Sequence, residues 1–201
     1  FSLLTRLRQC CCDVRLLPNQ IDISEPGAKE TILFQKLQDL KTNGSKAIIF
    51  SQFTSYLSII EKGLKLEIPD LNAYKLTGTT RDRNRPVKAF QEAKGSSVML
   101  ASLKAAGLGV TLTAADYVFL MDPWWNPAVE EQAIDRAHRI GRDKPVFIYR
   151  LISRGTIEEK VRFLQKEKKE VFKDIIETSD KPAKLFEYFS SLEELVKLEE
   201  T

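Results

Sequence analysis

The sequence holds little cysteine and almost no histidine. Three cysteines occur among 201 residues, and they are consecutive, Cys10 to Cys12. Adjacent cysteines are poorly placed to form a compact zinc site, and no C-x-x-C pair occurs. The single histidine, His138, excludes a histidine-rich metal centre. We therefore predict three reduced thiols in a reducing compartment and no metal site.

Long apolar runs are missing as well. No run reaches the roughly 18 residues that a membrane-spanning helix needs, and no signal peptide is visible. The first residue is Phe1 rather than methionine, which suggests a fragment excised from a longer protein. Hydrophobic residues make up 43% and charged residues 29% of the chain, which is usual for a soluble globular domain without a membrane partner.

Three phosphate-binding signatures are absent. The sequence has no G-x-x-x-x-G-K-[ST] phosphate loop, no acidic D-E-x-H motif for magnesium and no G-x-G-x-x-G dinucleotide fingerprint. A net charge of +3 is too small to predict a nucleic-acid binder from composition alone. Any basic surface must come from local clustering, which is densest at residues 81–88.

The most informative segment is residues 117–142, YVFLMDPWWNPAVEEQAIDRAHRIGR. The apolar run Tyr117–Met121 predicts a buried parallel strand. Asn126 is a good N-cap and Pro127 a good first helical residue. We therefore expect a helix from Pro127 to about Ile140, directly after the strand.

The expected helix carries two neighbouring stripes. Its apolar stripe should lie on the sheet and consists of Val129, Ala133, Ala137 and Ile140. Beside it, Gln132, Arg136 and Arg139 share one face. Arginine at such a border suits phosphate binding, because its guanidinium is a rigid fork of donors. An ordinary solvated face with local ion pairs is the alternative that the spacing leaves open.

The amino-acid sequence of this segment resembles the last two motifs of the Swi/Snf-type DNA-dependent ATPases, a branch of the superfamily-two helicases. Those motifs read D-x-x-W-N-P and Q-A-x-D-R-x-H-R-x-G-Q. Arg142 stands where the family usually has glutamine. The matching residues are Asp122, Trp125, Asn126 and Pro127 in the first motif, and Gln132, Ala133, Asp135, Arg136, His138, Arg139 and Gly141 in the second.

Two earlier segments extend the resemblance. The apolar strand KAIIF is followed by Ser51 and Gln52, like the family's F-S-Q motif, whose polar pair faces nucleic acid. A helix cap by Ser51 is an equally simple explanation of that serine. In LTGTTRDRNRPVKAF, Gly78 and Thr79 resemble the family's L-D-G-S-T element, and their backbone and hydroxyl groups suit phosphate positioning. Thr77 replaces the usual aspartate.

A glycine loop completes the set. LKAAGLGVTL resembles the family's fifth motif, L-K-A-G-G-x-G-L-N-L, with Lys104, Gly107 and Gly109 retained. Ala106 and Thr111 replace a glycine and an asparagine, which puts the detailed contacts of the loop in question. A glycine loop after a strand allows close approach of a phosphate.

Strands and helices alternate along the chain, which predicts a parallel sheet with helices on both faces. The resemblance implies an α/β, three-layer, RecA-like fold (P-loop NTPase-like) with a C-terminal helical brace. The expected divisions are an inter-lobe linker and helix at 1–27, the helicase C-terminal lobe at 28–155 and brace helices at 156–201. We expect strands at 46–50, 73–76, 97–102, 117–121 and 146–151, and helices at 2–12, 28–42, 54–66, 127–140 and 157–177.

Two local details follow from the same patterns. The helix at 28–42 should face inward through Ile32, Leu33, Leu37 and Leu40. Pro86 cannot lie deep inside a helix, so the helix near it should begin late, with Asn84 as its cap.

The resemblance implies the second motor lobe of an ATP-dependent translocase on double-stranded DNA. Arg136 and Arg139 would be arginine fingers, with Gln132, Gly107 and Gly109 at the ATP. Magnesium would be held by the first lobe, so these 201 residues alone should be inactive. The implied DNA contacts are Ser51, Gln52, Gly78, Thr79, Lys104, Trp125 and Asn126.

The implied partners are double-stranded DNA, the N-terminal RecA-like lobe and, as a further class, proteins bound to the DNA. The implied location is intracellular and DNA-associated: the nucleoid if the compact W-W-N-P form reflects a prokaryotic source, the nucleus if the source is eukaryotic. A non-catalytic nucleic-acid-binding or partner-docking domain with the motor fold is the alternative. The related lobe of an RNA helicase is a third, which the W-N-P block argues against.

Overall fold

The structure is a computed structural model, and it describes residues 2–18, 25–106, 111–137 and 145–166. The chain divides into two compact units, residues 1–161 and residues 162–201. No helix within the described ranges is both long and apolar enough to cross a membrane.

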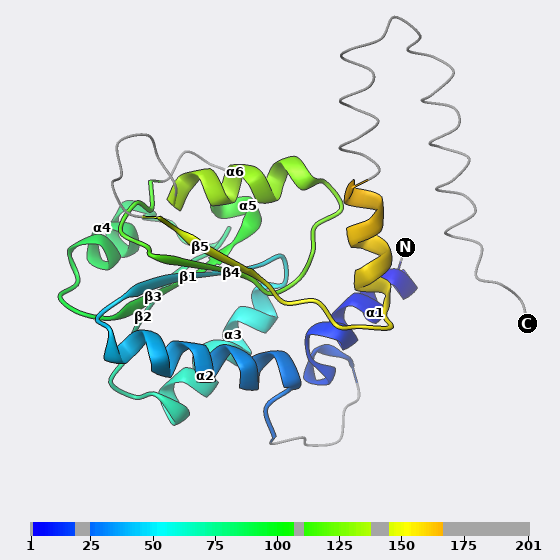
Figure 1. Ribbon diagram of the computed structural model, residues 1–201, viewed down its shortest axis with the longest axis horizontal. Helices are drawn as coiled ribbons and strands as arrows, with labels where there is room; N and C mark the ends of the chain where they lie inside the picture. The colour runs from blue at the N-terminus through cyan, green and yellow to red at the C-terminus, as the bar shows by residue number, and fades with distance from the viewer. Residues whose placement is uncertain (1, 19–24, 107–110, 138–144, 167–201) are drawn as a thin grey trace, which may run out of the picture. The chain divides into compact units, whose positions relative to one another are not determined.

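One sheet of five strands lies at the centre of the first unit (Figure 1). Its order is β2-β3-β1-β4-β5, and every neighbouring pair is parallel. Parallel strands need crossover connections, which here are helices. The expected α/β fold with a parallel sheet is therefore confirmed. The strands are β1 Lys46–Ser51, β2 Asn72–Leu76, β3 Ser97–Ser102, β4 Tyr117–Leu120 and β5 Phe147–Arg150.

Helices cover both faces of the sheet, which makes three layers (Figure 1). α2 and α3 pack on one face, and α4, α5 and α6 pack on the other. A further helix spans residues 157–166 within the described part of the chain. The elements are α1 Ser2–Cys12, the 3-10 turn η1 Val14–Leu16, α2 Ala28–Thr42, α3 Thr54–Glu67, α4 Asn84–Glu92, α5 Leu103–Ala106 and α6 Pro127–Ala137.

Successive side chains of β1 point to opposite faces of the sheet and pack in two separate cores. Ala47 and Ile49 join the core beneath α2 and α3, whereas Ile48 and Phe50 join the core beneath α4, α5 and α6. All four side chains are at most 1% exposed. A strand covered on both faces reads as a continuous apolar run, which is why KAIIF was recognisable in the sequence.

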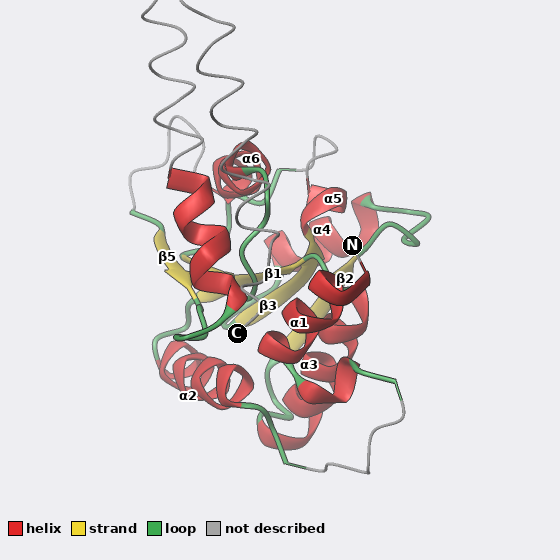
Figure 2. Cartoon of the chain, turned by 90° about the vertical axis from the view of Figure 1, so that its right-hand side faces the viewer, coloured by secondary structure: helices red, strands yellow, loops and turns green. Residues whose placement is uncertain are grey.

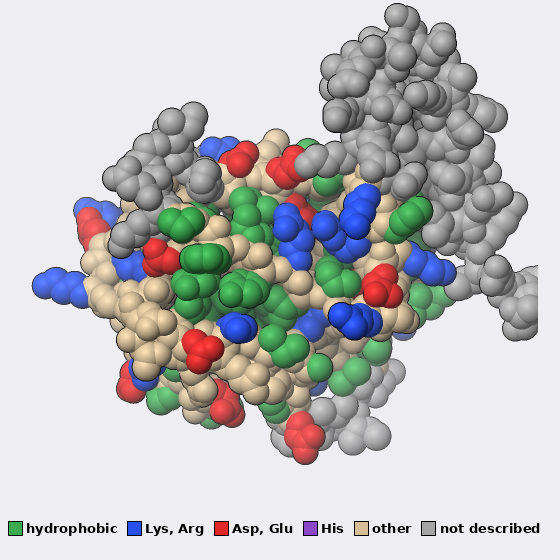
Figure 3. All heavy atoms as spheres, in the orientation of Figure 1, with side chains coloured by type: hydrophobic (Ala, Val, Ile, Leu, Met, Phe, Trp, Pro, Cys, Tyr) green, Lys and Arg blue, Asp and Glu red, His purple; other side chains and the backbone are tan. Residues whose placement is uncertain are grey.

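β5 forms one edge of the sheet and keeps apolar surface exposed. Phe147, Ile148 and Tyr149 are 51%, 39% and 37% exposed, and apolar side chains gather on the face across which β5 runs (Figure 3). Its aromatic rings stack on those of β4, with centroids 5.2 Å apart for Tyr117–Phe147 and 5.1 Å apart for Phe119–Tyr149. Cross-strand ring pairs therefore attach β5 to the sheet.

Two predicted details were wrong. Ile32 is 51% exposed, and Phe34 is buried in its place, because α2 turns a face of Leu33, Phe34 and Leu37 to the core. Asn84 is the first residue of α4 rather than its cap. Asp82 Oδ1 accepts hydrogen bonds from the N–H groups of Asn84 and Arg85, so the cap comes from further upstream.

A buried ion pair joins three distant segments of the unit. Lys29 Nζ lies 2.7 Å and 2.6 Å from the two carboxylate oxygens of Glu158 and donates a third bond to Met121 O at 2.7 Å. Ser153 N also donates to Glu158, at 2.8 Å. Glu158 is fully buried and Lys29 is 5% exposed. The pair therefore links the start of α2, the end of β4 and the start of the helix at 157–166.

Close approach of α2 and α3 depends on Gly63. A Cβ atom at this position would lie 2.5 Å from Glu30 Oε1 and 2.6 Å from Phe34 Cζ. Gly63→Ala should lower the free energy of unfolding by about 1–3 kcal/mol, although alanine is favoured in helices by about 1 kcal/mol. Urea denaturation measures this, with exposed Lys62→Ala as control. Stabilisation by Gly63→Ala would show that the two helices can separate freely.

Removing one member of the buried ion pair should be costly. Lys29→Met leaves Glu158 charged, buried and short of a partner, which should lower the free energy of unfolding by about 3–5 kcal/mol. The double variant Lys29→Met/Glu158→Leu should regain much of this, because no lone charge remains buried. Denaturant unfolding tests both variants. The control is Lys41→Met, which breaks the exposed Lys41–Asp70 pair at a cost of about 0–1 kcal/mol; an equally small effect of Lys29→Met would contradict the expectation.

Candidate functional site

The predicted polar residues follow strands whose carboxyl ends meet at one edge of the sheet. Gln52 follows β1, Gly78 follows β2, Lys104 lies in α5 after β3, and Trp125 follows β4. In Figure 1 this edge is on the right, and in Figure 2 it faces the viewer. Ligands of open α/β sheets bind at this edge.

The turn after β2 presents backbone groups to the outside. Thr80 N donates to Thr77 O at 3.0 Å, and Thr80 Oγ1 accepts from Thr77 N at 3.0 Å. The turn is thus closed by its own polar groups, while Gly78 and Thr79 stay exposed. A Cβ added to Gly78 would meet no protein atom within 4 Å. Packing within the protein therefore leaves the surface of Gly78 open.

Ser51, the last residue of β1, and Gln52, which follows it, are more buried than residues that face nucleic acid were expected to be. Ser51 has no exposed surface, and its Oγ accepts a hydrogen bond from Phe53 N at 3.0 Å, at the start of α3. Gln52 is half-buried, and its backbone N–H donates to both carboxylate oxygens of Asp122 at 3.3 Å. Its Nε2 is buried without a hydrogen-bond partner among the described residues. Ser51 thus caps a turn, while Gln52 is held close to Asp122.

Asp122 is the buried carboxyl group of this edge. Only 1% of the residue is exposed, and burial raises the pKa of its carboxyl group, opposed by the hydroxyl of Ser51 and the charge of Arg8. A carboxylate that accepts bonds from the end of β1 holds the turns after β1 and β4 together. Its place in the D-x-x-W-N-P motif is therefore explained by structure.

α1 reaches the same edge. Arg8, which sequence reasoning did not single out, is 4% exposed, and its Nη2 donates to Pro123 O. Ser153 Oγ, after β5, donates to Cys11 O at 3.2 Å. α1 is therefore fastened to the segments that follow β4 and β5. Its partners lie more than 100 residues away in sequence, so no local pattern could have revealed them.

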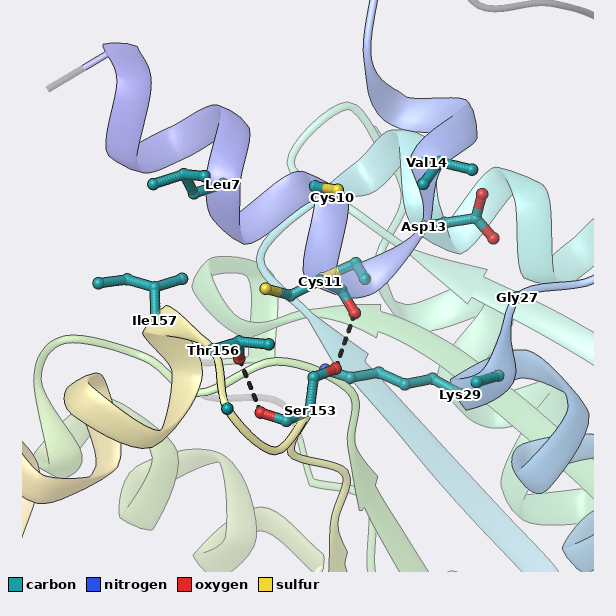
Figure 4. A pocket seen from close by; sticks show the side chains of 13 residues that line it. Leu7, Cys10, Cys11, Asp13, Val14, Gly27, Lys29, Ser153, Thr156 and Ile157 are labelled. Carbon is teal, nitrogen blue, oxygen red and sulfur yellow. Dashed lines mark hydrogen bonds between the residues drawn. The ribbon is translucent and has the colours of Figure 1, made fainter.

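A pocket of about 610 Å³ lies between α1 and the turn at 153–157 (Figure 4). Cys10 is exposed and Cys12 is buried, and burial raises the pKa of the Cys12 thiol. Burial therefore makes the Cys12 thiol a poor nucleophile. The pocket is lined by Leu7, Cys10, Cys11, Cys12, Asp13, Val14, Gly27, Ala28, Lys29, Ser153, Gly155, Thr156 and Ile157.

The N-terminal end of α6 begins at the edge as predicted. Asn126 Oδ1 accepts a hydrogen bond from Ala128 N at 3.1 Å, which confirms Asn126 as the cap. Asn126 is itself exposed, and Trp125 is half-buried. Trp124 instead packs against the core beneath α6, and its backbone N–H donates to Glu130 Oε1 at 2.8 Å. Neighbouring tryptophans therefore take different positions.

The buried face of α6 is wider than predicted. Ala133 and Ala137 are fully buried and Val129 is partly buried, as expected. Glu130 and Ile134 are also buried, and sequence reasoning missed both. Glu130 is acceptable there because its carboxylate accepts from Trp124 N and from Arg150 Nε, the latter at 3.4 Å. The face is rotated away from Gln132, which is exposed.

Arg136 lies at the border of that face, half-buried. Its Nε is buried and has no hydrogen-bond partner among the described residues, while its backbone oxygen accepts from Leu112 N at 2.9 Å. A half-buried guanidinium with an unused donor fits a phosphate group. Ten residues at 1.5 Å each place Arg136 about 15 Å along the helix from Asn126.

Three predicted site residues lie outside the described residues: Gly107, Gly109 and Arg139. Ile140, predicted on the buried face of α6, lies outside them too. Within the ranges that the structure describes, no group of three or more His, Cys, Asp or Glu side chains could hold a metal ion.

The sequence matches a known protein family and several helicase-related proteins. Residues 28–141 match the family described as helicase conserved C-terminal domain. The chain is 43% identical over 154 residues to the DNA repair protein RAD5A of Arabidopsis thaliana, covering 74% of this chain and 15% of that protein. It is 40% identical over 200 residues to an uncharacterized ATP-dependent helicase of Mycoplasma genitalium, covering 98% of this chain and 18% of that protein.

Solved structures agree with the sequence relatives. The C-terminal part of the Fun30 ATPase domain superposes with a TM-score of 0.67 at 34% identity, covering 80% of this chain and 53% of that one. The C-terminal domain of the Sulfolobus solfataricus SWI2/SNF2 ATPase superposes with a TM-score of 0.69 at 30% identity, covering 89% and 73%. The chain thus spans less than a fifth of the two full-length relatives but most of an isolated C-terminal domain.

Proposed function

Because this chain belongs to the helicase conserved C-terminal domain family, as a Swi/Snf-type C-terminal helicase lobe, we propose that it is the second motor lobe of an ATP-dependent translocase on double-stranded DNA. The observation that carries the proposal is the exposed polar edge of a parallel sheet. Gly78, Thr79, Lys104 and Asn126 follow three different strands and are all exposed there.

The DNA contacts follow from this exposure. Backbone N–H groups of the Gly78–Thr79 turn, the Lys104 ammonium and the Asn126 amide are donors that suit phosphate and sugar oxygens. Such contacts carry little sequence information, which suits a motor that moves along DNA of any sequence. Gln52 and Trp125 contribute at the half-buried border. Ser51 has no exposed surface and serves by holding the turn that presents Gln52.

The ATP contacts lie at the other end of α6. Arg136 and Arg139 stabilise negative charge on the transferring phosphate as arginine fingers, with Gln132 orienting them or touching the nucleotide. Gly107 and Gly109 form the backbone approach to a phosphate. Magnesium is held by the first lobe. ATP, when bound, supplies the phosphoryl group whose transfer drives movement.

The division of the chain follows the same reasoning. Residues 1–27 connect the two lobes, residues 28–155 form the lobe, and residues 156–201 form a brace. The partners are double-stranded DNA, the N-terminal RecA-like lobe and proteins on the DNA that the motor remodels. The protein acts where DNA is, in the nucleoid or the nucleus.

The arginine fingers can be tested in the full-length protein. Arg136→Ala and Arg139→Ala should each lower kcat by roughly 10³-fold or more, the usual range for removed arginine fingers. DNA affinity should change little, since the guanidinium acts at the far end of α6. Steady-state ATPase assays with saturating DNA measure the first effect, and DNA titration measures the second.

The matched control is Arg6→Ala, an exposed arginine of α1. The isolated 201 residues provide a second one, because without a phosphate loop they should hydrolyse no ATP above background. Near-normal DNA-stimulated turnover in Arg136→Ala, or robust turnover by the isolated chain, contradicts the proposal.

A substitution at Gly78 distinguishes a DNA-binding role of the turn after β2 from a purely structural one. Gly78→Ala should leave the melting temperature of the chain unchanged, because the new Cβ meets no protein atom within 4 Å. It should weaken DNA binding several-fold, because the methyl group takes the space of a closely approaching phosphate. Thermal melts and DNA titrations decide, with Asn72→Ala at the opposite end of β2 as control. Unchanged DNA affinity would remove this turn from the interface.

A further inference from the structure

Arg8 is a buried cation surrounded by the turn that follows β4. Its guanidinium carbon lies 5.3 Å from the centroid of the Trp125 ring and 6.0 Å from that of Phe53. Its Nη2 donates to Pro123 O. The negative charge of Asp122 acts on the same guanidinium. Four groups from two turns therefore converge on one side chain of α1.

The free-energy cost of burying the Arg8 guanidinium bears on what this residue does. Burying a guanidinium is costly unless its donors are satisfied and an opposite charge is near. Here one donor, Nε, is buried without a hydrogen-bond partner among the described residues. An apolar side chain would fasten α1 without that cost. What only the guanidinium supplies is a flat cation against the ring of Trp125 and a donor to the carbonyl two residues before it.

We propose that Arg8 is a positioning residue that holds the Trp125 ring in one orientation. The carbonyl of Pro123 fixes the position of the guanidinium, and the guanidinium then fixes the plane of the ring. Asn126, which follows immediately, caps α6. α1 thereby sets the geometry of the turn between β4 and α6. Its role in turnover rests on the proposed function, in which Trp125 touches DNA; its hold on the ring does not.

The ring orientation can be measured without DNA. Trp124 and Trp125 are the two tryptophans of the chain, so Trp124→Phe leaves Trp125 as the sole tryptophan. In that background Arg8→Met should expose the ring and increase its quenching by acrylamide. Because Trp125 is half-buried, its cation–π contact should contribute about 1.4 kcal/mol, between the exposed and the desolvated values, which corresponds to a roughly tenfold larger population of the released ring. Arg8→Lys keeps the charge and should give an intermediate value.

Turnover is measured in the full-length protein. Arg8→Met should lower DNA-stimulated kcat by roughly tenfold, for the same loss of about 1.4 kcal/mol, while the DNA concentration for half-maximal stimulation changes little. Arg8→Lys should recover part of the loss. Arg6→Met, an exposed arginine on the same helix, is the matched control and should resemble wild type in both measurements.

The outcomes separate this inference from the proposed function. If Trp125→Ala keeps full DNA stimulation, the proposed DNA contact of Trp125 fails, while the quenching measurement still decides whether Arg8 holds the ring. Quenching as in Arg6→Met, in a folded Arg8→Met chain, overturns the inference. If Arg8→Met does not fold, Arg8→Lys decides: wild-type quenching together with wild-type turnover overturns it, and increased quenching supports it.

Discussion

A buried lysine that must be completely satisfied determines how the outer segments attach to the sheet. Lys29 has three acceptors, two from Glu158 and one from Met121 O. Burying an ammonium group without them would cost several kcal/mol. The segments that supply these acceptors are therefore fixed relative to one another wherever the unit is folded. Ser153 and Cys11 extend the arrangement to α1, so that the carboxyl edge of the sheet is organised around this charge.

The parallel sheet is the second constraint. Because all five strands run the same way, every turn that follows a strand emerges at the same edge. Residues separated by tens of positions, such as Gly78, Lys104 and Asn126, thereby come to one surface. α1 is fastened to that surface through Arg8, which donates to Pro123 O, and through Cys11 O, which accepts from Ser153 Oγ. Gly78, Lys104 and Asn126 stay exposed there.

Sequence patterns revealed features whose causes are local. The bounds of α2 and β3 matched because apolar periodicity and turn residues define them over a few positions. The choice between Ile32 and Phe34 failed, because it depends on how α2 meets α3 and the sheet. Arg8 and Glu158 were missed because their partners lie 115 and 129 residues away. Of the candidate site residues, Gly78, Thr79, Lys104 and Asn126 follow strand ends and are exposed, which a pattern shows. The burial of Ser51 depends on Asp122, which a pattern does not show.

α6 also has a mechanical consequence. It is a stiff rod whose first residues are fixed at the sheet edge and whose Arg136 lies about 15 Å away. A tilt of roughly 4° about the fixed end moves the other end by about 1 Å. Reaction rates change by roughly 10²-fold for a misplacement of about 1 Å. In the proposed function, the length of α6 therefore converts a slight angular change at the sheet edge into a large change in rate at Arg136.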